Sequence, residues 1–394
     1  MSEFHIEIDF AQKHPAGQIV CGDVFITKLI KEDGRTILVL SDGVGHGVRA
    51  NVLATMTATM ALNYTSLYKR PEAAARIIMD ALPRDSEGVK TYATFTIIEL
   101  ESDGMVRIVN YDNPKSVITR NGEPFIPTKE YVLDIKGAEN VGKVLRCREF
   151  RAKKEDRIVF MSDGITQSGM GNEKMRMGWG QENVETFVVQ QLARSSDMSA
   201  RRLSKKVLNK AIQNDRFNLQ DDASCGVIYF RDPREMLLVT GPPFFKAKDK
   251  DFAQRIHDYK GIKIVCGGTT AEIIARELNL EIETEISLSN PYAIPKYVMK
   301  GFNLVTEGIL TIGKIEELLE AYDDEQTYGN SPAEEIVKQL VQHDRILVFV
   351  GTRINWAHHD PDQPIEMEIR KFVVKRIVKL LEEKFFKEVV VDFY

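Results

Sequence analysis

The sequence has little cysteine, no long apolar run and no excess of positive charge, and each shortage excludes a class of protein. Its four cysteines include no CxxC pair, which argues against a structural zinc site. No apolar run is long enough to cross a bilayer, and the acidic start MSEFHIEIDF lacks the features of a signal peptide. The formal net charge of -5 argues against a dedicated nucleic-acid binder. We therefore expect a cytoplasmic protein that binds neither nucleic acid nor membrane.

The 394 residues, 43% hydrophobic and 28% charged, have the composition of an ordinary globular protein of about two or three domains. Over the first 230 residues, strand-like apolar runs are interrupted by two helical groups, residues 50–82 and 182–215. This order predicts an α+β fold in which helices cover the faces of sheets. The strand-like runs are FHIEIDFA, QIVCGDVFITKLI, TILVLSD, ATFTIIEL, MVRIVNYD, SVITRNG, DRIVFMSDG and ASCGVIYF.

The pattern changes at Met236, where short apolar strands begin to alternate with helical segments. That alternation is typical of an α/β domain with a mostly parallel sheet and helices on both faces. We predict a polar joint at residues 231–235, separating a domain at 1–232 from a Rossmann-like domain at 235–394, and a surface loop at DDEQTYGNSP. The predicted strands are MLLVTG, IKIVCGG, FNLVTEG, RILVFVG and EVVVDFY, and the predicted helices are DKDFAQRIHDY, TAEIIAREL, GKIEELLEAY and EMEIRKFVVKRIVKLLEEKF.

Aspartates recur where the strands of the first domain begin or end. They are Asp23 in CGDVF, Asp42 in LVLSDG, Asp163 in IVFMSDG, and Asp221 and Asp222 in LQDDAS. An unpaired buried carboxylate is costly, so a cluster of them needs a cation. Oxygen ligands of this kind match the preference of Mg²⁺ or Mn²⁺. A single SDG is an ordinary turn signal, but the complete ordered set is more specific.

The motifs GD, DGxGHG, ATFTI…NYDNPKSVI, SDGITQ and DDAS occur in that order. In this respect the sequence resembles the bacterial metal-dependent protein phosphatases of the sporulation stage II E type, relatives of eukaryotic protein phosphatase 2C. The resemblance covers roughly residues 5 to 230. It implies a β-sandwich flanked by helices, two divalent cations at one end of the sandwich, and hydrolysis of phosphoserine or phosphothreonine on proteins.

The resemblance also implies roles for individual residues. Asp42 would bridge two Mn²⁺ or Mg²⁺ ions, the Gly43 carbonyl would bind one of them, and Asp23 would bind directly or through water. A water between the two ions would then attack phosphorus. The last motif has Ser224 where relatives usually have threonine, which keeps the hydroxyl. Asp163 and Asp221 would complete the metal sites, and Asp222 stands where relatives carry Asn or Asp.

His46 is the one histidine inside these motifs. It could protonate the leaving group as a general acid. The alternative is a loop residue that seats the following helix.

In the second domain, several strands end in glycine, and CGGTTAEIIAREL has the strongest signal. Thr269 or Thr270 could cap the helix, and the free N–H groups after Gly267 and Gly268 favour an anion. The alternative is an ordinary strand-to-helix turn. The sequence has no Walker lysine and no complete GxGxxG, so no nucleotide can be named.

The sequence thus predicts a metal-dependent serine/threonine phosphatase whose partner is a phosphorylated regulatory protein. The C-terminal domain would regulate it, bind a small anionic ligand or support oligomerisation, and a homodimer is left open. The rival hypothesis is a catalytically weak scaffold that binds phosphoproteins. A third hypothesis, an independent C-terminal enzyme, lacks a recognisable acid–base or nucleophile set.

Overall fold

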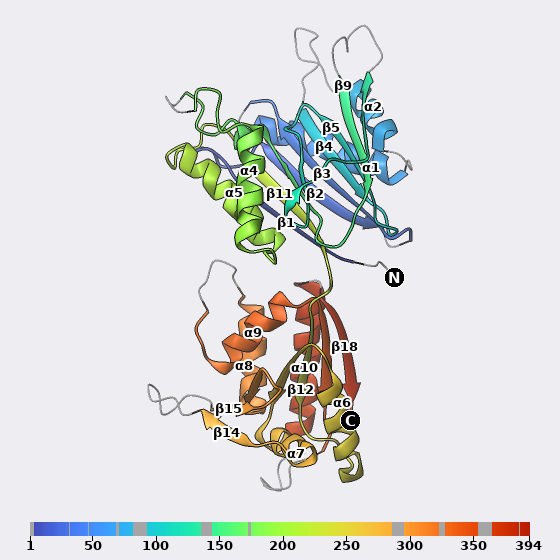
Figure 1. The fold of residues 1–394 in the computed structure, drawn as a ribbon, viewed down its shortest axis with the longest axis vertical. Coiled ribbons are helices and arrows are strands. Elements are labelled where there is room, and N and C mark those ends of the chain that lie inside the picture. The colour runs from blue at the N-terminus through green and yellow to red at the C-terminus, as the bar shows by residue number, and fades with distance from the viewer. Residues whose placement is uncertain are drawn as a thin grey trace. The chain divides into compact units, whose positions relative to one another are not determined.

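The protein folds into two compact units, Met1–Asp232 and Pro233–Tyr394 (Figure 1). No helix in the described part of the chain is long and apolar enough to span a membrane. The computed structural model describes residues 4–30, 32–45, 47–67, 71–81, 93–134, 144–171, 175–285, 295–322, 328–353, 365–385 and 387–394.

The first unit contains two antiparallel sheets. The six-stranded sheet has the order β2 (Asp23–Ile30), β3 (Arg35–Gly43), β4 (Ala93–Leu100), β5 (Met105–Tyr111), β9 (Val144–Arg151) and β8 (Lys129–Asp134). The five-stranded sheet has the order β1 (His5–Lys13), β11 (Ala223–Arg231), β10 (Arg157–Met161), β6 (Val117–Arg120) and β7 (Glu123–Pro124).

The alternation of side chains along each strand explains how the two sheets pack. On β3, Leu38 and Leu40 face the second sheet and belong to the same core as its buried Phe160. Ile37 and Val39 face the other way and pack against α1 (Gly47–Leu67) and α2 (Pro71–Ala81). The outer face of the five-stranded sheet packs against α4 (Gln181–Arg194) and α5 (Ala200–Asn214). The predicted sandwich flanked by helices is confirmed (Figure 1).

The second unit has one seven-stranded sheet, and the prediction of a mostly parallel sheet with helices on both faces is confirmed. Its five parallel strands are β16 (Leu304–Thr306), β13 (Ile262–Cys266), β12 (Glu235–Thr240), β17 (Arg345–Val350) and β18 (Glu388–Phe393), with antiparallel β14 (Ile282–Glu285) and β15 (Lys296–Met299) at one edge. Residues of α6 (Asp249–Asp258) and α7 (Gly268–Leu278) cover one face, and residues of α8 (Ile309–Glu320), α9 (Pro332–Gln342) and α10 (Ile365–Glu383) cover the other.

Sequence patterns missed six of these elements: β7, β8, β9, β14, β15 and α9. Three arginines and a glutamate interrupt the apolar residues of β9 (VLRCREFR) without regular alternation, and β14 is a short, polar edge strand, so neither shows a clear strand pattern. The loop predicted at 323–332 is wrong at its end, because Pro332 is the first residue of α9. Ser331 and Glu334 form a capping box there. Residues 323–327 lie outside the described residues.

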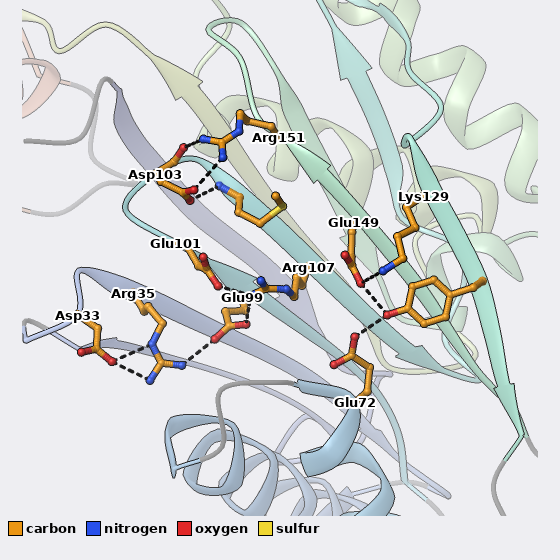
Figure 2. Close-up of polar contacts among 12 residues, drawn as sticks. Asp33, Arg35, Glu72, Glu99, Glu101, Asp103, Arg107, Lys129, Glu149 and Arg151 are labelled. Carbon is orange, nitrogen blue, oxygen red and sulfur yellow. Dashed lines mark hydrogen bonds and ion pairs between the residues drawn. The ribbon is translucent and has the colours of Figure 1, made fainter.

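Separate groups of polar contacts lie on the helix-covered face of the six-stranded sheet (Figure 2). The fully buried carboxylate of Glu99 on β4 pairs with Arg35 at 2.7 Å and with Arg107 at 3.1 Å. Nearby, the Tyr131 hydroxyl lies 2.6 Å from a carboxylate oxygen of Glu72 on α2 and 2.7 Å from one of Glu149 on β9, and its single proton can be donated to either. Two arginines thus balance the charge of a carboxylate that would otherwise be costly to bury.

Candidate active site

The candidate site lies at one end of the sandwich, where both sheets contribute carboxylates. Asp23, the first residue of β2, lies directly opposite Asp42 of β3. Side chains two residues apart point to the same face of a strand, so Asp23 lies on the face of Phe25 and Asp42 lies on the face of Leu40. That face packs against the second sheet. From that sheet, Asp163 follows β10 at the start of the short helix α3 (Asp163–Thr166), and Asp222 immediately precedes β11.

These carboxylates are buried without adequate hydrogen-bond partners. Asp23 and Asp222 are 1% and 2% exposed, and no oxygen of either carboxylate has a hydrogen bond among the described residues. The Oδ1 atom of Asp163 is likewise unpaired within that part of the chain, whereas its Oδ2 accepts a 2.8 Å bond from Gln167. Leaving charged oxygens in this state costs several kcal/mol unless a cation or a proton neutralises them.

The pKa values report the same lack of compensation. Burial raises the pKa of Asp42 to about 10, with further contributions from the charges of Asp23, Asp163 and Asp221. Burial also raises the pKa of Asp23 to about 7, although the neighbouring hydroxyls of Ser224 and Ser162 offset part of the increase. The pKa of Asp163 is raised as well, chiefly by burial. Carboxyl groups that repel one another in this way favour a bound cation.

The carboxylate oxygens fit Mg²⁺ or Mn²⁺ better than a metal whose ligands all come from protein side chains. Among the described residues, no three His, Cys, Asp or Glu side chains form a ready metal cluster. Mg²⁺ usually keeps several waters and takes only one or two carboxylates directly. Oxygen ligands with room for water therefore suit these ions better than the thiolate and imidazole ligands that zinc favours.

Two of the glycines beside the aspartates leave space for Asp222. A Cβ on Gly22 would stand 2.6 Å from Oδ2 of Asp222, and a Cβ on Gly164 would stand 2.2 Å from its backbone oxygen. Any side chain at either position would displace Asp222. The pairing of glycine with aspartate in GD and SDG thus reflects close packing around the carboxylate cluster.

The remaining predicted residues have less direct evidence. Gly43 is the last residue of β3 and lies opposite Ala93. Asp221 accepts a 2.8 Å bond from the Asp222 backbone N–H, so it shapes the loop as well as adding charge near Asp42. His46 lies outside the described residues, and its role as an acid stays a prediction.

Sequence reasoning missed residues around the carboxylates. Asp112, with a left-handed φ of 60°, adds negative charge near Asp163 and raises its pKa. Its signal is the DNP segment, because Asp and Asn tolerate that backbone conformation in turns. Burial and the charges of Asp23 and Asp222 raise the pKa of the Cys21 thiol, so it remains a neutral neighbour.

In the second unit, the structure corrects the predicted helix cap. Gly267, with φ 140°, is the N-cap of α7 and has no side-chain cap, while Gly268, Thr269 and Thr270 lie in the first turn. The carboxylate of Glu307 stands 3.6 Å from where a Cβ on Gly268 would be. An anion at this helix start would therefore meet a carboxylate of the chain itself, and the anion site stays a prediction.

Comparison with known proteins identifies the first unit. Residues 32–231 match the family described as stage II sporulation protein E (SpoIIE), and a comparison with curated proteins found no match. The solved structures that it resembles include the PP2C phosphatase domain, with a regulatory fragment, of SpoIIE from Bacillus subtilis. That similarity has 17% identity and a TM-score of 0.48, and covers 59% of this chain and 63% of that structure.

Two further structures show similarity to the chain. RsbX, crystallised in complex with magnesium, is 16% identical with a TM-score of 0.41, covering 58% of this chain and 100% of that one. The S. agalactiae serine/threonine phosphatase is 13% identical with a TM-score of 0.41, covering 57% and 99%. The family match spans more than half of the 394 residues. The chain belongs to the SpoIIE family, with a PP2C-type serine/threonine phosphatase domain over residues 32–231 and a C-terminal region outside that match.

Proposed function

We propose that this protein hydrolyses phosphoserine or phosphothreonine on a regulatory phosphoprotein, using two Mn²⁺ or Mg²⁺ ions. One observation carries the proposal: buried, unpaired carboxylates from both sheets meet at one end of the sandwich. The SpoIIE family match and the magnesium complex of RsbX support the same chemistry.

The position of each aspartate suggests its task. Asp42 is influenced by Asp23, Asp163 and Asp221, which makes it the natural carboxylate to serve both cations. Asp163 and Asp221 would complete the two sites from the second sheet, and the Gly43 carbonyl would add a backbone ligand at the end of β3. Asp23 and Asp222, both deeply buried, would fix the site from behind, directly or through water. Bound cations lower the pKa of a water and offset the charge that develops on the phosphoryl group.

The proposal is tested by two measurements on the full chain. Hydrolysis of p-nitrophenyl phosphate should require Mn²⁺ or Mg²⁺ and stop when EDTA is added. Independently of activity, Mn²⁺ should raise the melting temperature, because a ligand that binds only the folded state stabilises it, by about 2.7 kcal/mol at 100 times its Kd. Phosphopeptide binding with neither turnover nor a metal-dependent melting shift would favour the scaffold hypothesis instead.

For the C-terminal domain, we infer that a small anionic ligand binds at the carboxyl ends of its parallel strands and regulates the phosphatase. From β12 the chain first adds β13 and β16 on one side of the sheet, and then adds β17 and β18 on the other side. The point at which the order of strands switches therefore lies between β12 and β17, although all five strands are parallel. In sheets of this type, ligands bind beside that reversal. The loops that follow these strands carry Gly241 and Gly351, whose backbones approach closely: a Cβ on Gly351 would stand 2.2 Å from the Gly241 oxygen. Thermal-shift screening of the full chain with nucleotides, phosphates and carboxylates tests this inference.

A further inference from the structure

A small cleft opens on the first unit where the turn between β5 and β6 meets β8 and β9. Its lining includes Asn110 of β5, Lys115 and Ser116 of the turn, and Arg148 of β9. The cleft holds ≈ 20 Å³, which is room for about one water molecule or one oxygen-bearing group. It can therefore accept the tip of a side chain, but not a peptide segment.

Two polar side chains in the cleft wall are buried and incompletely paired. Ser116 is 5% exposed, and its hydroxyl has no hydrogen-bond partner among the described residues. Asn110 is 6% exposed, and its Oδ1 is unpaired in the same part of the chain, although its Nδ2 donates to Thr96 and to the Pro114 carbonyl. Both unpaired atoms lie below the surface that solvent reaches, so they make the cleft wall polar without offering a contact to a ligand.

The charges around the cleft are mostly positive. Lys115, Arg146 and Arg148 line it, against the single carboxylate of Glu130. Glu130 lies 2.9 Å from the Lys115 amine and 3.6 Å from Nε of Arg148, so it already shows where a carboxylate is held. Arg148 is 7% exposed and is fixed by a 2.7 Å bond from its Nη1 to the Ser116 carbonyl. The cleft thus brings together a fixed guanidinium and two exposed cations, which suits an oxyanion.

The cleft lies on the same side of the six-stranded sheet as the aspartates. Asp42 pairs with Thr94, Thr96 pairs with Asn110, and Asn110 pairs with Arg146. Arg146 is therefore three strands from Asp42 and two residues farther along, a distance of about 16 Å given spacings of about 4.8 Å between strands and about 3.4 Å between residues. An extended peptide covers that distance in about four or five residues.

We propose that this cleft binds the carboxylate of an aspartate or glutamate that lies four or five residues from the phosphorylated residue of the substrate protein. The proposal rests on the proposed function for the identity of its ligand. It assigns to Lys115, Arg146 and Arg148 the selection of acidic phosphoprotein segments. The carboxylate would accept bonds from these cations, and Glu130 would turn outward.

The test measures binding rather than turnover. Fluorescence anisotropy with the full chain and Mn²⁺ would use peptides in which a phosphonate analogue replaces phosphoserine. One peptide carries aspartates four and five residues away on both sides, a second carries asparagines there, and a third carries aspartates only next to the analogue. The first should bind about tenfold more tightly than the other two, the effect of one or two charge-assisted hydrogen bonds.

Variants identify the cleft as the source of that preference. Lys115→Gln with Arg146→Gln should abolish the tenfold difference, while Lys205→Gln, on the exposed surface of α5, should preserve it. Ser116→Ala, which removes an unpaired hydroxyl buried behind the cations, should leave both the difference and the melting temperature unchanged.

Equal binding of the three peptides, or an unchanged preference in the double variant, would overturn the proposal. So would a double variant that loses affinity for inorganic phosphate but not for the acidic peptide, because the cleft would then be a phosphate site. A chain without metal-dependent turnover that still prefers the first peptide would contradict the proposed function and leave the cleft assignment intact.

Discussion

Two groups of buried carboxylates lie at opposite ends of β3 and β4. At one end, Glu99 is fully buried, but Arg35 and Arg107 contact it, so the chain supplies its own positive charge (Figure 2). At the other end, Asp23 and Asp42 face each other, and neither oxygen of Asp23 has a hydrogen bond among the described residues. The same sheet thus contains a completed ion-pair network and an incomplete one. The difference separates a structural carboxylate from a candidate metal-binding one more clearly than burial alone does.

The largest expected effect is a loss of activity when a carboxylate charge is removed from the candidate metal site. Asp42→Asn or Asp163→Asn should lower Mn²⁺-dependent phosphatase activity by at least about a thousandfold, the loss expected when several kcal/mol of transition-state stabilisation is removed. Steady-state assays with p-nitrophenyl phosphate measure it. Asp103→Asn, at an exposed carboxylate beyond the other end of the sheet, is the matched control and should retain activity. Near-normal turnover in both site variants would contradict the metal assignment.

The next effect concerns the completed network. Glu99→Ala leaves two arginines facing each other in a largely buried site, and should lower the free energy of unfolding by about 3–5 kcal/mol. Urea titration of the full chain measures this change. Glu101→Ala removes a more exposed partner of Arg107 and should cost less than about 1 kcal/mol. Equal losses of unfolding free energy in the two variants would mean that the buried Glu99 contributes no more to stability than the more exposed Glu101.

The smallest expected effect is on the pH dependence of stability in the metal-free protein. In the metal-free protein, the pKa values of Asp23, about 7, and Asp42, about 10, lie above the ordinary value of 3.8. The folded state then binds more protons than the unfolded state between about pH 4 and pH 10, so stability falls as pH rises through this range. Asp42→Asn should remove part of that slope and raise the metal-free melting temperature by about 2–4 °C at pH 8. Melting curves in EDTA from pH 5 to 8 measure it, and a destabilised variant at pH 8 would refute the repulsion described here.

Much of the first unit was predictable because its apolar strands alternate clearly and its aspartates follow them at recognisable turns. The sequence also indicated the parallel sheet of the second unit. The strand β9 was missed because its arginines do not form a surface stripe: Arg148 is buried against the Ser116 carbonyl. The effect of the Asp112 charge on the pKa of Asp163 was missed for a different reason. It depends on two loops that are distant in sequence and come close only in the folded sandwich. A threonine cap on α7 was a reasonable local prediction, but the left-handed glycine before it begins the helix instead.

The order of the aspartates along the chain has a consequence for folding. Asp23 and Asp42 belong to a local hairpin, whereas Asp163 and Asp222 arrive only when β10 and β11 form the second sheet. A folding intermediate with the first sheet alone would carry half of the candidate site and bind Mn²⁺ weakly. Contacts between such distant segments form late in folding, since loop closure opposes them. Mn²⁺ should therefore slow unfolding far more than it accelerates folding, which makes the ion a reporter for the moment when the two sheets close.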